Sequence, residues 1–329
     1  MLRRKLIAGR GVAPGTWLIA GIRLAGPFDL LDARARLASL ARGRLGFALA
    51  AGGVGWVAIQ LAVGYRIGIF NVPAGDVLVW HRAGADILRG QSPYLLRPFS
   101  TNSFWYAPPW ALFFALFAWL PPAITQGVMW ILDVLALRYV AGSWRGAALA
   151  CWFPVMAFEF AAGTTNLIMA AAIVAAVRDD TWIAAVGALA KFAPVIAIRD
   201  WRRLVIVLAV LCLPVLMWPS LWVDWLQQLV GAVGFPLGPQ IPVPLWARLV
   251  LAGGLLVLVR RPWGRALAAV VAIPAFYWVC VVELIAPLAV WLRQLPAPAL
   301  PLAPAAVRTG PGGPRGASSR RPIEGLLRP

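Results

Sequence analysis

The sequence has few residues that bind metals or form covalent cross-links. Among its 329 residues are one histidine, His81, and three cysteines, Cys151, Cys212 and Cys280. The cysteines all fall within apolar runs, so we expect no disulfide framework, and a single histidine without a Cys/His cluster argues against a zinc site. We therefore expect neither a metal nor a cofactor.

Charged residues are also scarce. They make up 13% of the chain, against 61% hydrophobic residues, and the mean hydropathy is +0.79. Repeated apolar runs of about 15–20 residues are typical of membrane-spanning helices. The composition therefore predicts an all-α, polytopic helical membrane protein.

The charge that is present is mostly positive. The formal net charge is +18, concentrated at the ends of the chain and in a few loops. In a membrane protein this pattern indicates topology and contact with anionic membrane lipids, so we expect no nucleic-acid partner. Residues 1–44 hold nine basic residues and are predicted to be a cytoplasmic segment, in which Pro27–Arg44 is either an amphipathic helix on the inner membrane face or a disordered tail.

The multispanning domain is predicted to cover residues 45–292, with a disordered, Pro/Gly/Arg-rich tail at 293–329. Arg138, Arg145 and Arg178 fit the topology less well than the other basic residues. About nine spans are expected: Leu45–Gly64, Ala107–Leu120, Ala123–Val140, Trp144–Phe160, Thr164–Val177, Trp182–Ile198, Leu204–Trp218, Val243–Val259 and Ala266–Leu292.

The first outer connection, about residues 65–106, is long, and long connections often carry function. It contains Asp76, which either caps a following helix or takes part in chemistry at the membrane surface. Val77–Arg89 is predicted to form this helix, with an apolar face suited to lying on the membrane. His81 is a candidate for proton transfer or a surface aromatic, and Asp86, another candidate, has an ion-pair partner at helical spacing in Arg82.

Lys191 is one of only two lysines and lies in an apolar run, three residues before Pro194. An ionisable group within a span is a candidate for a functional site, and a lysine there could hold a phosphate. Alternatively, it pairs with a buried acid: Glu159, Asp133 or Glu283.

A polar turn, Gly163–Asn166, separates two of the apolar runs. Asn166 in this turn could hydrogen-bond a ligand or a neighbouring helix. Glu159, just before the turn, belongs either to the same site or to the membrane boundary.

The ordered set of these motifs resembles glycosyltransferase family 87, a multispanning family of the GT-C superfamily. Asp76, Gly84, the segment GQSPY at 90–94 and FWYAPP at 104–109 resemble its D…G…G-x-x-P-Y…F-x-Y-x-P-P signature. GTTN at 163–166 looks like its G-Q-x-N turn, and KFAP at 191–194 looks like its K-x-x-P element. The resemblance covers about Trp56–Arg203.

The resemblance implies a GT-C-like fold and transfer of a sugar, typically mannose, from a polyprenyl-phosphate donor to a lipid or glycan acceptor on the outer membrane face. It implies that Asp76 is the general base of an inverting reaction and that Lys191 binds the lipid phosphate. Tyr94, Tyr106 and Asn166 would contact the substrates. A lipid or small-molecule transporter or flippase, and a non-catalytic membrane scaffold, are the alternatives.

Overall fold

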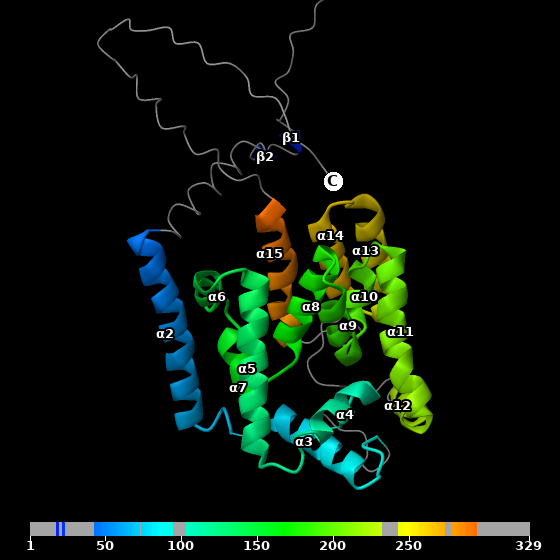
Figure 1. Cartoon of the computed structure of the whole chain (residues 1–329). Coiled ribbons are helices and arrows are strands. Elements are labelled where there is room, and N and C mark those ends of the chain that lie inside the picture. The colour runs from blue at the N-terminus through cyan, green and yellow to red at the C-terminus, as the bar shows by residue number, and fades with distance from the viewer. Residues whose placement is uncertain are drawn as a thin grey trace, which may run out of the picture. The chain divides into compact units, whose positions relative to one another are not determined.

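The computed structural model of the chain describes residues 18–19, 22–23, 43–72, 74–94, 103–231, 243–273 and 278–294. Two strands of two residues each, β1 (Leu18–Ile19) and β2 (Ile22–Arg23), pair antiparallel. From residue 43 onward, the described secondary structure is helical (Figure 1), which confirms the all-α part of the prediction. Most of the predicted amphipathic helix at Pro27–Arg44, and nearly all of the predicted tail at 293–329, lie outside the described residues.

The helices differ widely in length. They are α2 (Arg44–Arg66), α3 (Gly75–Leu88), α4 (Pro108–Ala115), α5 (Pro122–Ala141), α6 (Trp144–Ala150), α7 (Met156–Ala162), α8 (Asn166–Arg178), α9 (Thr181–Ala190), α10 (Ala193–Ala197), α11 (Trp201–Met217), α12 (Pro219–Gly231), α13 (Leu245–Leu258), α14 (Pro262–Val271), the 3₁₀ helix η1 (Trp278–Leu284) and α15 (Ile285–Gln294).

The prediction of about nine spans is wrong for the described part of the chain. Two helices, α2 and α5, are long and apolar enough to cross a membrane. The number rises to four if two bent pairs each form one span: α7 with α8, bent by 111°, and α11 with α12, bent by 102°.

The remaining apolar runs are interrupted by helix breaks. The predicted span 144–160 divides into α6 and α7 around Pro154, and the predicted span 182–198 breaks at Lys191 before Pro194. A helix rises about 1.5 Å per residue, so these short pieces cannot cross a hydrocarbon core of about 30 Å alone. The sequence identified the apolar segments, but it did not predict that the helices within them are broken.

Helix α3 is present where the sequence predicts a helix, but its apolar face is covered by protein. Val77 and Trp80 are fully buried, and the Trp80 ring stacks on Phe114 of α4 with centroids 5.1 Å apart. Gly84 lies against the backbone of Phe114, where a Cβ atom would come within 2.5 Å. Most of this face therefore packs on protein, while Leu88 at its end is exposed.

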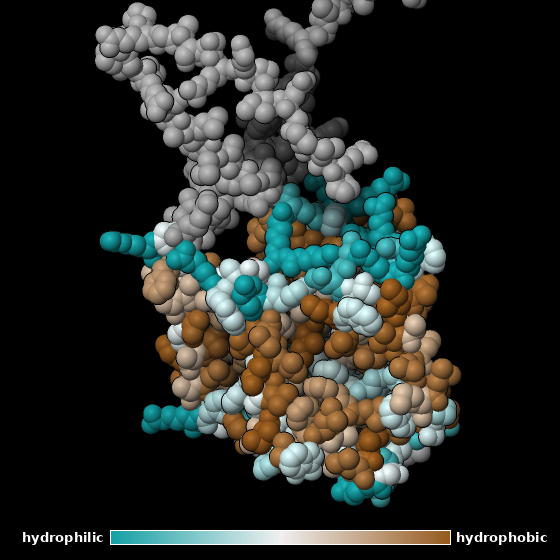
Figure 2. All heavy atoms as spheres, in the orientation of Figure 1, coloured by the Kyte–Doolittle hydropathy of each residue, from teal (hydrophilic) through white to brown (hydrophobic). Residues whose placement is uncertain are grey.

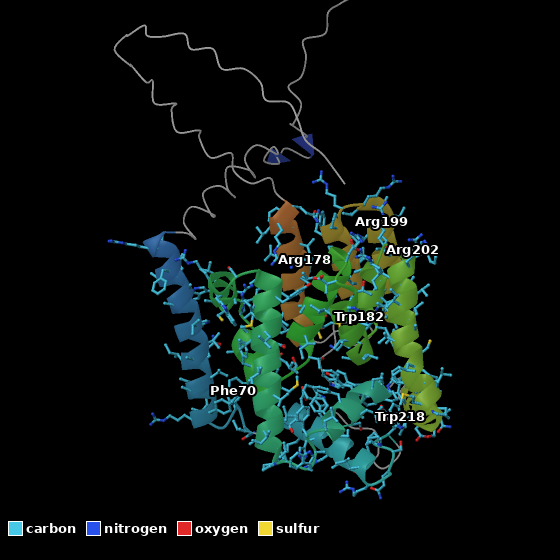
Figure 3. All side chains as sticks on the ribbon, viewed as in Figure 1. Phe70, Arg178, Trp182, Arg199, Arg202 and Trp218 are labelled. Atoms are coloured by element: carbon cyan, nitrogen blue, oxygen red, sulfur yellow. The ribbon has the colours of Figure 1, made fainter. Side chains whose placement is uncertain are left out.

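Several arginines link helix ends at one end of the helical unit. Arg203 at the start of α11 pairs with Asp179 after α8 (2.9 Å), and Arg265 of α14 donates to the carbonyl of Ala197 in α10 (3.1 Å). Figure 3 shows Arg178 at the same end as Arg199 and Arg202, so the broken helices bring it into line with the other basic residues. On the face in Figure 2, hydrophilic residues gather at this end, beside a broad hydrophobic surface.

The contact at Gly84 predicts a destabilising substitution. Gly84→Ala should lower the free energy of unfolding by about 1–3 kcal/mol, because the added methyl group meets backbone that must shift. Thermal unfolding in detergent would measure this. The matched control is Gly127→Ala in α5, where a Cβ atom meets nothing within 4 Å. Equal stability of the two variants would contradict this account.

Candidate functional site

The start of α3 is fixed by α5. The amide of Ala74 donates to Gln126 Oε1 (2.9 Å), and the Ala74 carbonyl accepts the first helical hydrogen bond, from Leu78 (3.0 Å). Ala74 is therefore the N-cap residue, and Asp76 lies within the first turn. The interpretation of Asp76 as the N-cap is wrong, although a carboxylate in the first turn still interacts favourably with the helix dipole.

Asp76 lies in the first turn of α3 with its side chain exposed. Its side chain is accessible to solvent, yet burial among surrounding protein atoms raises its pKa above the ordinary value for an aspartate. The positive charge of Lys191 opposes this rise, which places the ammonium group within electrostatic range. A carboxyl group that is both accessible and desolvated is suited to exchanging a proton with a bound molecule.

Tyr106 lies beside both charges. Thr165 Oγ1 donates to the Tyr106 hydroxyl (3.2 Å), and the Tyr106 and Trp80 rings meet edge to face, with centroids 5.7 Å apart. Burial, more than any other influence, raises the pKa of Tyr106 to about 12. The hydroxyl therefore keeps its proton at neutral pH and can donate it in a hydrogen bond.

The turn between α7 and α8 forms a hydrogen-bonded network. Gly163 ends α7 with φ +63°, a left-handed conformation that glycine adopts without strain. Asn166 Nδ2 then donates to Glu159 Oε1 (2.8 Å), while Thr164 Oγ1 donates to Glu159 Oε2. Glu159 thus belongs to the site. Because Asn166 uses its amide nitrogen to bond Glu159, its amide oxygen is available to a further partner.

That partner is Lys191, which lies in extended conformation at the end of α9. Its Nζ donates to Asn166 Oδ1 (3.0 Å) and forms an ion pair with Glu283 Oε1 (3.4 Å). The Lys191 side chain is 20% exposed, whereas that of Glu283 is fully buried. The alternative of a buried acid partner is thus confirmed, with Glu283 as that acid.

We call this group of side chains the polar cluster. It draws on α3, the segment before α4, α7, the start of α8, the α9–α10 break and η1. Its members are Asp76, Tyr106, Glu159, Thr165, Asn166, Lys191 and Glu283.

Three predicted site residues make other contacts. Tyr94 donates to the backbone carbonyl of Tyr106 (2.9 Å), so it holds the segment that carries that residue. His81 Nε2 donates to the carbonyl of Leu120 (2.9 Å). Asp86 is ten residues beyond Asp76, about 15 Å along the helix axis, and it pairs with Arg89 instead of the predicted Arg82.

The sequence analysis did not identify two residues as members of this cluster, Thr165 and Glu283. Thr165 was read only as part of a polar turn, and Glu283 only as one of three acids that could pair with Lys191. An ionisable residue within an apolar run is the signal that identifies Lys191, and Glu283 carries the same signal. Within the described residues, no group of three or more His, Cys, Asp or Glu side chains could hold a metal ion.

Comparison of the chain with protein-family models, curated proteins and solved structures finds no match. The likeness to glycosyltransferase family 87 therefore remains a prediction from the motifs.

The burial of Asp76 predicts how stability depends on pH. A raised pKa means that folding disfavours the charged carboxylate, so Asp76 lowers stability above its pKa, and this penalty fades as the pH falls toward the ordinary value of about 3.9. We expect Asp76→Asn to unfold at the same or a higher temperature than the native chain at neutral pH, with the difference shrinking in acid. Thermal unfolding across this pH range is the measurement.

The matched control is Asp86→Asn, which should unfold at a lower temperature because it loses the pairing with Arg89. A lower unfolding temperature for Asp76→Asn at neutral pH would show that Asp76 serves the fold.

Proposed function

We propose that this chain is a membrane glycosyltransferase that moves a sugar, expected to be mannose, from a polyprenyl-phosphate donor to a lipid or glycan acceptor. The observation that carries the proposal is that an accessible carboxylate, Asp76, lies within electrostatic range of a partly exposed ammonium group, Lys191. A base and a cation are the two groups that transfer from a lipid phosphate requires.

The reaction assigns one role to each charge. Asp76 accepts the proton of the acceptor hydroxyl as its oxygen bonds to the anomeric carbon. The bond from that carbon to the phosphate oxygen breaks, and the phosphate leaves with the electron pair, so the configuration inverts. Lys191 stabilises the growing negative charge on the phosphate, and Tyr106 donates a hydrogen bond to the substrate. No metal or cofactor enters this scheme.

The orientation follows from the arginines. Basic residues favour the cytoplasmic side, so the end with Arg178 and Arg199 is assigned to the cytoplasm of a multi-pass cell-membrane protein. Asp76 is then assigned to the extracytoplasmic side, where a lipid or glycan acceptor would reach it.

A transporter or flippase is the second candidate. Asp133, Glu159 and Glu283 are fully buried among the helices, and buried ionisable groups also line ion and substrate pathways. Such a protein would move a labelled polyprenyl-phosphate sugar across a vesicle membrane without cleaving it. A non-catalytic scaffold would do neither.

The proposed base gives the sharpest test. Asp76→Asn keeps the side-chain shape but cannot take the proton, so turnover of a labelled polyprenyl-phosphate sugar should fall by roughly 10²–10⁴. The control is Asp86→Asn, which should retain turnover because Asp86 lies away from the polar cluster. A fully active Asp76→Asn protein would refute the mechanism.

Orientation can be tested by cysteine labelling in whole cells. Cys151 and Cys280 are buried, so Cys212→Ser removes the one exposed thiol among the described residues. On that background, a cysteine in place of exposed Val72 should react with a membrane-impermeant maleimide. A cysteine in place of exposed Trp201 should react only after permeabilisation. The reverse pattern would show that Asp76 lies on the cytoplasmic side.

A further inference from the structure

We propose that Glu283 takes up a proton when an anion binds at Lys191, so that anion binding at the polar cluster is coupled to proton uptake. This inference rests on the proposed function, because the anion is the phosphodiester of the donor.

The geometry separates the two members of the ion pair. The Lys191 side chain is partly exposed, while that of Glu283 is fully buried. Only one of the two Glu283 oxygens, Oε1, receives a hydrogen bond from Lys191, and Oε2 has no hydrogen-bond partner. Lys191 Nζ donates to Asn166 Oδ1 and to Glu283 Oε1, so one of its three hydrogens is left for an anion.

The charges around Lys191 do not favour an anion. Asp76, Glu159 and Glu283 are three acids around one ammonium group, and the other titratable groups that face it, Tyr106 and Cys280, supply no positive charge. A phosphodiester would add another negative charge, which like-charge repulsion opposes. Binding thus requires that one of the three acids be neutral.

Glu283 is the acid best placed to accept the proton. Asp76 must stay ionised to act as the base. Both oxygens of Glu159 accept hydrogen bonds, from Asn166 and Thr164, whereas Oε2 of Glu283 accepts none. When the anion binds, the positive charge of Lys191 is shared between the anion and Glu283. The buried carboxylate is then less well compensated, which is costly. Protonation removes that cost.

Binding of geranyl methyl phosphate to the detergent-solubilised full chain would test this. The probe is a short isoprenyl phosphodiester that keeps one negative charge throughout the neutral range, so any pH dependence belongs to the protein. Where Glu283 is ionised in the free protein, the affinity should fall about tenfold per pH unit as the pH rises. Calorimetry in buffers of different ionisation enthalpy should count about one proton taken up per anion bound.

Three variants identify the acid that takes up the proton. Glu283→Gln should bind the probe with an affinity that no longer depends on pH, and with no proton uptake. Glu159→Gln should keep the pH dependence of the native chain. Lys191→Ala should lose binding, because the cation itself is gone.

Proton uptake that persists in Glu283→Gln, or that is lost in Glu159→Gln instead, would overturn the assignment to Glu283. Binding by the native chain without proton uptake would overturn the inference and leave the proposed function standing. This calorimetric count needs no variant, so it decides the matter even if Glu283→Gln does not fold. Failure of the native chain to bind the probe at any pH would contradict the donor site and the inference together.

Discussion

The ammonium group of Lys191 has to be compensated wherever the chain buries it, and much of the structure follows from this requirement. An ammonium group taken out of water is costly unless a charge and hydrogen-bond acceptors accompany it. Here η1 supplies a carboxylate, Glu283, and the turn before α8 supplies the amide oxygen of Asn166. Three segments distant in sequence must therefore converge on one point.

Convergence explains why so many helices are short. Backbone that is not helical is tolerated within a membrane protein where other protein groups or a water-filled cavity satisfy it. The breaks after α7 and after α9 both end at the polar cluster, where the turn residues bond to Glu159 and Lys191. A continuous helix through either break would place these side chains elsewhere. The interruptions that reduce the number of spans therefore also bring the residues of the polar cluster together.

The sequence predicted the local features better than the way they combine. Turn residues on both sides of α3 allowed its prediction within about two residues, and Pro194 marked the break at Lys191. Hydropathy could not reveal the number of spans, because it reports apolarity and not whether a helix is continuous. The partner of Asp86 was equally hidden, since Arg82 and Arg89 both lie at helical spacing from it. The pairing of Lys191 with Glu283, 92 residues away, depends on tertiary packing alone.

One glutamine sets the spacing between the two halves of the site. Gln126 of α5 is fully buried and accepts a hydrogen bond from the amide of Ala74, the N-cap residue of α3. It lies so close to Gly163 that a Cβ atom there would come within 2.8 Å of its amide nitrogen. The segment that carries Asp76 and the turn that carries Asn166 therefore rest on the same side chain. A displacement of α5, for example in a thicker or thinner membrane, would therefore act on both segments at once. Lys191 and Glu283 lie on other elements, so the same displacement would change the distances between the two sides of the site.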